Sequence, residues 1–214
     1  AWIGMVTALA TVLTLALWTG HASAHHLSIL TPANTASHSL LIAAKTDHAM
    51  IEGERVEAPW GFVDFCKRNP GECASTSGAA QKVPLSAKRV AELSVVQMRV
   101  NRQVSYTTDH NNYGRDEFWT YPHARGDCED YALEKRRRLI AMGWPRSALL
   151  LTAARMENGQ KHLVLVAITD KGDFVLDNRN GAPRSWAAIK YQWLARQSRF
   201  KETDWVALNS SKLN

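Results

Sequence analysis

The chain has 214 residues, of which 45% are hydrophobic and 21% charged, and its formal net charge is +6 at pH 7. This length accommodates one domain with a full hydrophobic core, and the composition is ordinary for a globular protein. The basic residues are scattered except for the run Lys135–Arg138, which we expect to be a solvated helix face. Without aromatic interleaving or a nucleic-acid-binding motif, this charge predicts no nucleic-acid partner.

The N-terminal segment has the pattern of a secretory signal peptide. Residues 5–18 are uncharged and mostly apolar, and this stretch is too short to span a membrane comfortably. Residues 22–24, Ala-Ser-Ala, match the small-residue pattern of a cleavage site. We therefore predict a signal peptide over residues 1–24 and a periplasmic or secreted protein.

The rest of the chain divides into three parts by composition. Residues 25–57 are polar and show no persistent period, so we expect a loosely structured lead-in. Residues 58–208 carry the periodic segments and form the predicted folded domain. Residues 209–214 are expected to be a C-terminal tail.

The chain has three cysteines, and an odd number in an exported protein indicates a pair and a free thiol. Cys66 and Cys73 flank an Asn-Pro-Gly turn, which can bring them within bridging distance. We therefore predict a disulfide between Cys66 and Cys73. This pairing leaves Cys128 unpaired, which favours a catalytic role for its thiol.

Two helices are predicted from apolar residues at helical spacing. The first opens at Ser86 and continues to about Val104. The second begins at Cys128 and ends at Met142–Pro145, because glycine followed by proline is typical of a helix C-terminus. Between the two helices, residues 106–115 are polar and rich in Asn, Asp and Thr, which indicates a loop long enough to carry function.

After the second helix, the pattern changes to that of strands and turns. Strands are predicted over 147–155, 162–168 and 174–177, and an Asn-Gly turn joins the first two of them. A further helix is predicted over 186–198 and a short strand over 205–208. An antiparallel meander behind a helix gives an α+β domain, in which the helix that carries the free cysteine packs on the sheet.

Cys128 is predicted to be the first residue of its helix. Asp127 is a good N-cap residue, and Asp130 lies where a side-chain acceptor can reach back in capping-box fashion. The free N–H groups and the positive end of the helix dipole stabilise a thiolate at this position, so Cys128 is a candidate nucleophile. The alternative is a buried structural cysteine on an amphipathic helix.

A cysteine nucleophile needs a base and a group that orients the base. His162 opens one predicted strand and Asp177 closes the next, so antiparallel pairing places both at the same edge of the sheet. We therefore predict a Cys128, His162 and Asp177 triad. His110 and His123 are the competing bases, and His123, which would lie in the loop before the helix, has no evident orienting partner.

The residues around these positions form a combination of motifs. They are Gly126–Asp130, His162–Leu165 and Leu176–Asn178, with Val100-Asn101, Tyr106, Asp109 and the approach Trp119 to Pro122 upstream, and Tyr191–Trp193 downstream. Over residues 58–208, this combination resembles the bacterial transglutaminase-like cysteine proteinases, the LapG-type periplasmic proteases. The resemblance implies a papain-like, transglutaminase-type core, with Cys128 as nucleophile, His162 as base and Asp177 as orienting acid.

The resemblance also implies a metal, because some members of the family bind calcium beside the nucleophile. The matching acidic positions are Asp127 and Glu129, with Asp109 as a further candidate, and their oxygen atoms suit Ca²⁺. The alternative is that Asp127 caps the helix and Glu129 is a solvated acid of the first turn, which the helix dipole favours.

The substrate implied by the resemblance is a periplasmic segment of an envelope or surface protein, such as a large adhesin, which the enzyme hydrolyses through a thioester. An inner-membrane regulatory protein is implied as a further partner. Two other hypotheses remain. The same triad serves a transglutaminase if an amine replaces water, or a cell-wall peptidase if the substrate is a peptidoglycan peptide. A catalytically silent binding module is the third class.

Overall fold

The computed structural model describes residues 49–74 and 82–208. The predicted signal peptide (1–24), most of the predicted lead-in and the predicted tail (209–214) lie outside the described residues. The end of the lead-in differs from expectation, since residues Glu52–Val56 form strand β1 and pair with β9 (Trp205–Leu208). A strand partner distant in sequence orders this polar segment, and local composition does not reveal such a partner.

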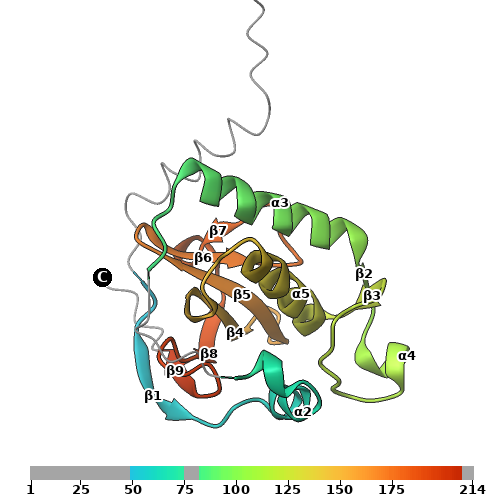
Figure 1. The fold of residues 1–214 in the computed structure, drawn as a ribbon. Coiled ribbons are helices and arrows are strands. Elements are labelled where there is room, and N and C mark those ends of the chain that lie inside the picture. The colour runs from blue at the N-terminus through green and yellow to red at the C-terminus, as the bar shows by residue number, and fades with distance from the viewer. Residues whose placement is uncertain (1–48, 75–81, 209–214) are drawn as a thin grey trace, which may run out of the picture. The chain divides into compact units, whose positions relative to one another are not determined.

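Seven strands form one sheet in the order β1-β9-β8-β4-β5-β6-β7, and all neighbours pair antiparallel (Figure 1). The predicted meander is confirmed as β4, β5 and β6, and its first turn carries Gly159 at a φ of 82°. Besides β1 and β9, the strands of the sheet are β4 (Leu149–Arg155), β5 (Lys161–Thr169), β6 (Gly172–Leu176), β7 (Arg184–Ser185) and β8 (Gln192–Gln197).

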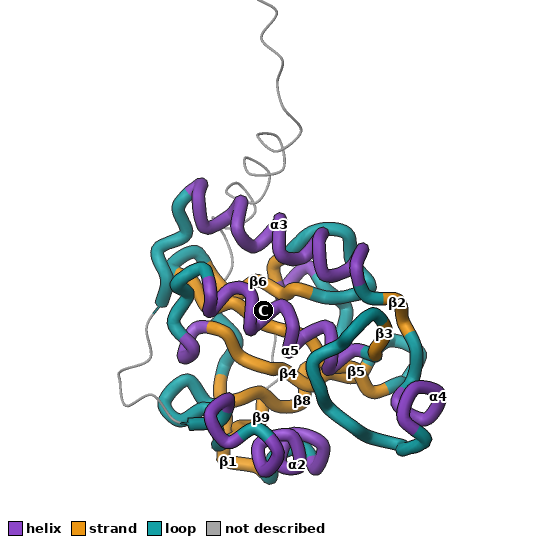
Figure 2. Tube along the Cα trace, turned by 45° about the vertical axis from the view of Figure 1, so that its right-hand side comes forward, coloured by secondary structure: helices purple, strands orange, loops and turns teal. Residues whose placement is uncertain are grey.

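Helix α5 crosses the sheet and carries Cys128. It packs against β5 and β4, and α3 packs against α5 (Figure 2). A parallel pair of two-residue strands, β2 and β3, lies at the start of α5. The helices and short strands are α2 (Trp60–Arg68), α3 (Ala87–Gln103), α4 (Asp109–Tyr113), α5 (Cys128–Ala141), β2 (Ser105–Tyr106) and β3 (Arg125–Gly126), with 3₁₀ turns η1 (Pro70–Glu72), η2 (Arg146–Ala148) and η3 (Trp186–Ala188).

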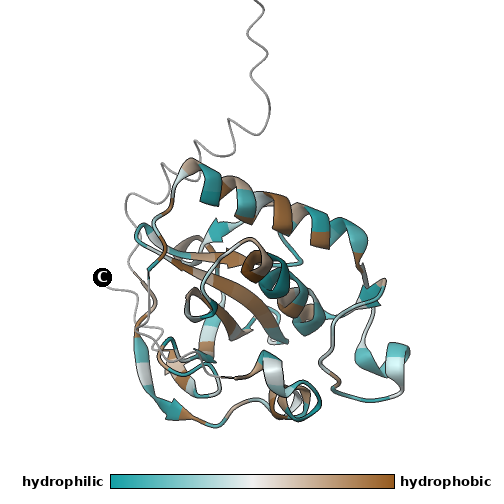
Figure 3. Cartoon of the chain, viewed as in Figure 1, coloured by the Kyte–Doolittle hydropathy of each residue, from teal (hydrophilic) through white to brown (hydrophobic). Residues whose placement is uncertain are grey.

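The core lies between the central strands and α5. Every residue of β5 after Lys161 is buried, and Leu149, Leu150 and Leu151 of β4 are fully buried. The central strands are coloured mostly as hydrophobic in Figure 3. A continuous apolar run of this kind is typical of a strand covered on both faces. Burial of each leucine contributes about 1.5–3 kcal/mol, so these strands form a rigid base for the residues at their ends.

The predicted helix over 186–198 is wrong. This segment forms the 3₁₀ turn η3 and then strand β8, which pairs with β4 and β9. Trp193 and Ile189 are buried as the helical pattern required, but they belong to an extended chain. Pairing on both sides satisfies the backbone of β8, and this tertiary gain exceeds the local helix preference.

The basic run on α5 is only partly solvated, which corrects the expectation of an exposed face. Lys135 and Arg136 are buried, and Nε of Arg136 donates to the carbonyl oxygen of Leu149 at 3.0 Å. Burial lowers the pKa of Lys135 to about 7, and the negative charge of Asp177 opposes this shift. Arg137 and Arg138 each form an ion pair with Glu134 of the same helix.

The predicted disulfide forms between Cys66 at the end of α2 and Cys73 after η1, with a Cα–Cα distance of 5.6 Å. Cys128 is left as a free thiol. The predicted loop 106–115 is partly regular, because Thr108 accepts a hydrogen bond from the N–H of Asn111 and caps α4.

Candidate active site

Cys128 is the first residue of α5, and the short strands β2 and β3 fix where this helix starts. Tyr106 pairs with Gly126, and the N–H of Thr107 donates to the carbonyl oxygen of Gly126 at 3.0 Å. A Cβ atom added at Gly126 would lie 2.4 Å from Oδ2 of Asp130, so the close approach requires glycine. These contacts therefore fix the backbone position of the residues that precede Cys128.

Asp127 occupies the predicted N-cap position of α5, but the predicted side-chain cap does not form. Its side chain makes no cap hydrogen bond within the described residues, and its Oδ2 accepts from the N–H of Asp109 at 3.1 Å. Oδ1 of Asp130 accepts from the N–H of Thr120 at 2.9 Å. Burial raises the pKa of Asp130 to about 8. Both acids thus hold the preceding loop against the start of α5.

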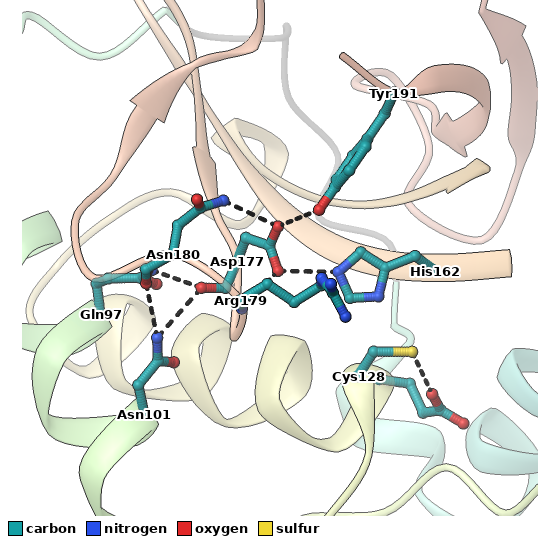
Figure 4. A network of polar contacts seen from close by, with 9 residues as sticks. Gln97, Asn101, Cys128, His162, Asp177, Arg179, Asn180 and Tyr191 are labelled. Carbon is teal, nitrogen blue, oxygen red and sulfur yellow. Dashed lines mark hydrogen bonds and ion pairs between the residues drawn. The ribbon is translucent and has the colours of Figure 1, made fainter. Parts of the chain in front are cut away.

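His162 and Asp177 lie in contact at one edge of the sheet, as the strand order predicts. His162 is in β5 and Asp177 follows β6, and Nε2 of His162 lies 2.8 Å from Oδ1 of Asp177. Both side chains are buried. An N–H on Nε2 donates to the carboxylate and leaves Nδ1 free to accept a proton. Figure 4 shows His162 between Asp177 and Cys128.

Asp177 accepts further hydrogen bonds that fix its carboxylate. The N–H of Arg179 donates to Oδ1 at 2.9 Å, and Oδ2 accepts from Asn180 at 3.0 Å and from the hydroxyl of Tyr191 at 2.8 Å. Burial raises the pKa of Asp177, but the hydrogen bond and the charge of His162 hold it below its usual value. Asp177 therefore remains an anion that orients His162.

Gln97 and Asn180 belong to the same network, and neither was predicted from the sequence. Gln97 is buried on α3, and its Nε2 donates to the carbonyl oxygens of Asp177 and Asn180, each at 2.6 Å. Asn101 donates to the same two carbonyls at 3.2 and 2.9 Å (Figure 4). Gln97 and Asn101 lie one turn apart on α3, and two amides at this spacing on an otherwise apolar face are the sequence signal for this anchor.

Cys128 and His162 line one cavity of about 320 Å³, which we call the thiol cavity. Neither His110 nor His123 is among the described residues that line it. His110 is exposed, with its Nδ1 3.4 Å from Oδ1 of Asp116, and His123 is also exposed. The lining residues of the thiol cavity are Tyr106, Cys128, Tyr131, Met156, Gln160, Lys161, His162, Asn178 and Arg179.

The electrostatic environment of Cys128 differs from the one predicted. Burial, together with the charge of Glu129 and a hydrogen bond from Sγ to Oε2 of Glu129 at 3.1 Å, raises the pKa of the Cys128 thiol well above its usual value. The N–H of Leu163 and the helix N-terminus act in the opposite direction. Desolvation and neighbouring carboxylates thus outweigh the helix dipole that was expected to lower this pKa.

Asp109, Asp127 and Glu129 form an acidic cluster beside Cys128, and one carboxylate oxygen of each lies within 4.8 Å of the others. Oδ1 of Asp109 and Oδ1 of Asp127 are buried and accept no hydrogen bond from the described residues. Burial and the charge of Asp109 raise the pKa of Asp127 to about 6, and burial and Asp127 raise that of Glu129. Three acids in this arrangement repel one another, and a bound cation would offset the repulsion.

A cysteine at the start of a helix, beside a histidine and aspartate pair on an antiparallel sheet, defines a transglutaminase-like α+β core. The chain belongs to the bacterial transglutaminase-like cysteine proteinase family BTLCP, whose model matches residues 52–213. It is therefore a transglutaminase-like cysteine peptidase, and the family resemblance of its sequence is confirmed.

Solved structures of Legionella pneumophila LapG are similar to this chain. One shares 27% identity at a TM-score of 0.44 and covers 49% of this chain, and the match spans 61% of that LapG chain. A calcium-bound form shares 26% identity at a TM-score of 0.47, and the match covers 57% of this chain and 72% of that LapG chain. An EGTA-treated form shares 27% identity at a TM-score of 0.47, and the match covers 56% of this chain and 71% of that LapG chain. No curated protein matches the chain.

Proposed function

We propose that this protein is a periplasmic cysteine endopeptidase, which hydrolyses a peptide bond of an envelope or surface protein of the adhesin type. The proposal rests on one observation above all. His162 is held by Asp177 at 2.8 Å and lines the same cavity as the free thiol of Cys128. A nucleophile, a base and an orienting acid in this order are the parts that acyl transfer through a thioester requires.

The proposed mechanism begins with proton transfer from Sγ of Cys128 to Nδ1 of His162. The thiolate attacks the peptide carbonyl, and the imidazolium then returns the proton to the leaving amine. Water activated by His162 hydrolyses the thioester and releases the free cysteine. Asp177 stabilises the imidazolium in both steps, since its carboxylate remains ionised.

The tetrahedral intermediate needs donors for its oxyanion, and we propose two groups for this role. The first is the backbone N–H of Cys128, one of those that the first turn of a helix leaves free. The second is the hydroxyl of Tyr106, which lines the thiol cavity. Burial and the charge of Cys128 raise the pKa of Tyr106, so its phenol keeps the proton that it would donate.

Replacement of Tyr106 by phenylalanine tests this second donor. We expect kcat to fall about a hundredfold with little change in KM, because an oxyanion contact stabilises the transition state more than the substrate. Steady-state cleavage of a peptide substrate measures both constants. Tyr113→Phe is the matched control, since Tyr113 packs against Phe118 and is not among the described residues of the cavity. Equal losses in both variants would contradict the assignment.

We propose that the acidic cluster binds calcium, with Asp127, Glu129 and Asp109 as ligands. The residues fit this ion, because their donors are all carboxylate oxygens and two of these atoms are buried without a hydrogen bond from the described residues. When bound, calcium supplies positive charge beside Cys128. The alternative role for Asp127, a side-chain cap of α5, loses support because that cap bond is not made.

Chelation tests the calcium proposal. We expect EGTA to lower the melting temperature and the activity together, because a ligand that binds only the folded state stabilises it. Asp127→Asn/Glu129→Gln should be insensitive to EGTA, whereas Asp116→Asn, which removes an exposed acid near α4, should respond like wild type. Differential scanning fluorimetry and a cleavage assay provide the measurements. Unchanged melting and activity after chelation would contradict calcium binding.

The proposed location rests on the predicted export of the chain, and the proposed partner rests on the family resemblance. The Cys66–Cys73 disulfide suits an oxidising compartment, in agreement with the predicted signal peptide over residues 1–24. In the described part of the chain, no helix is both long and apolar enough to cross a membrane. An inner-membrane regulatory protein that sequesters the enzyme is proposed as a further partner.

The acceptor of the acyl group decides between the alternative activities. Hydrolysis is expected to yield new N- and C-termini in a protein substrate, whereas a transglutaminase would attach an added primary amine, and a cell-wall peptidase would release peptidoglycan peptides. Mass spectrometry of the products with and without the amine separates these results. If a thiol probe failed to label Cys128 near neutral pH and no product formed, the chain would instead be a silent binding module.

A further inference from the structure

Basic side chains line a second cavity, which adjoins the thiol cavity. This basic cavity has a volume of about 570 Å³, and Arg179, Arg184 and Lys190 line it. It shares Met156 and Arg179 with the thiol cavity, so a ligand in one is next to the other. Several hundred Å³ is the usual size of a ligand site, and this one is larger than the cavity that holds the thiol.

The charged side chains that line the two cavities are mostly positive. Lys161 in the thiol cavity and the three cations of the basic cavity are all exposed. The acidic residue among the described lining of the basic cavity is Glu157. Within residues 49–74 and 82–208, no ion pair engages Lys161, Arg179, Arg184 or Lys190, although many other surface cations of the chain are paired. These cations are therefore available to an anionic ligand.

Arg179 and Arg184 are both bonded to the surrounding chain. The backbone N–H of Arg179 donates to Oδ1 of Asp177, and its side chain hydrogen-bonds Tyr191. Nη2 of Arg184 donates to the carbonyl oxygen of Ala188 at 2.9 Å. Part of the ordering cost of binding is thereby met in the free protein. Arg179 lies two residues after Asp177 and lines both cavities. The basic cavity therefore lies next to the proposed triad.

We propose that the basic cavity binds acidic side chains of the polypeptide substrate, so that the enzyme prefers a peptide bond flanked on one side by Asp or Glu. This inference rests on the proposed function and specifies the substrate class of the same site. Guanidinium groups bind carboxylates in a bidentate manner, and a concentration of unpaired cations attracts acidic segments toward the thiol.

A binding experiment tests the cavity independently of catalysis. The full chain carrying Cys128→Ala is titrated against fluorescein-labelled Gly-Glu-Glu-Glu-Glu-Gly and against the same peptide with Gln for Glu, at low salt, by fluorescence anisotropy. We expect the Glu peptide to bind roughly tenfold more tightly, as two to three partly exposed ion pairs would produce. High salt should reduce the difference.

Charge reversal locates the interaction. Arg184→Glu/Lys190→Glu in the Cys128→Ala chain should remove the preference for the Glu peptide. Arg99→Glu/Arg102→Glu is the matched control, since both arginines are exposed on α3 and the net charge changes equally. Equal affinity for the Glu and Gln peptides, or an equal loss in both double variants, would overturn the proposal. Tighter binding of a single-stranded oligonucleotide, lost only in the cavity variant, would also overturn it.

A cleavage experiment separates this inference from the proposed function. Wild-type protein is incubated with quenched-fluorescent peptide pools flanked by Glu, Gln or Lys, and we expect the Glu pool to be cleaved fastest. Binding of the Glu peptide without cleavage of any pool would support the acidic-ligand cavity and contradict proteolysis. Equal cleavage of all pools without preferential binding would support proteolysis and overturn the acidic preference.

Discussion

Replacement of Cys128 by alanine is expected to abolish peptide cleavage, with a loss on the order of a million-fold. The thiolate is the proposed nucleophile, and no other free cysteine is present to replace it. The fold should persist, because alanine has the highest helix propensity and the bonds that hold the start of α5 come from Gly126, Asp127 and Asp130. Cleavage of an unfolded protein substrate, with circular dichroism as the folding control, provides the measurement.

The other two residues of the proposed triad should give related losses. His162→Ala should be nearly as severe as Cys128→Ala, because without the base the thiol keeps its proton and the leaving amine has no donor. Asp177→Asn should lose about 10⁴-fold, since it changes the tautomer and orientation of His162. The effects should not add in the Cys128→Ala/His162→Ala variant, because the residues act as a unit.

A matched variant tests the identity of the base. His123→Ala should leave cleavage near the wild-type rate, because His123 is exposed and lies outside the described lining of the thiol cavity. If His123→Ala lost activity while His162→Ala kept it, the base would be misassigned, and the contact between His162 and Asp177 would have a structural role only.

Replacement of Arg196 by alanine is expected to lower the free energy of unfolding by about 3–5 kcal/mol. The Arg196 side chain is fully buried, and its Nη1 lies 2.9 Å from Oδ2 of Asp173, which is also fully buried. Its Nη2 lies 2.7 Å from Oε1 of Glu52. The loss is large because removal of the cation leaves the Asp173 carboxylate buried without a counter-charge, and the N–H of Met50 is then its remaining partner among the described residues. Urea denaturation followed by tryptophan fluorescence provides the measurement.

Arg55→Ala is the matched control for this ion pair. Nη2 of Arg55 lies 2.8 Å from Oδ1 of Asp204, a similar distance, but the arginine side chain is 70% exposed. We expect a loss of about 0–1 kcal/mol, because water screens the pair. Arg196→Lys should lie between the two, since lysine keeps the charge but not the fork that reaches both acids. Equal losses for Arg196→Ala and Arg55→Ala would contradict the role of burial.

Local sequence predicted the parts of the chain whose structure depends on near neighbours. The helix from Ser86, the helix from Cys128 and the Asn-Gly turn form as expected, because caps, spacing and turn residues act within a few positions. The meander follows from the turns, and strand order alone placed His162 and Asp177 at one edge. The disulfide was predictable because its cysteines flank a short turn.

Features that depend on residues far apart in the sequence could not be predicted in this way. Residues 186–198 carry a helical pattern but form β8, because two strands distant in sequence pair with them. The sequence gives no sign that Asp173 and Glu52 neutralise Arg196. Lys135 belongs to a run that is expected to be solvated, but the packing of α5 buries it.

The candidate site shows the same division. Local sequence was enough to select the residues of the proposed triad, because Cys128, His162 and Asp177 lie at element ends that local rules define. The electrostatics of the site depend on tertiary packing, since burial and Glu129 raise the pKa of the Cys128 thiol, whereas the helix dipole was expected to lower it. Desolvation depends on what every packed element removes from water, and no single segment contains that information.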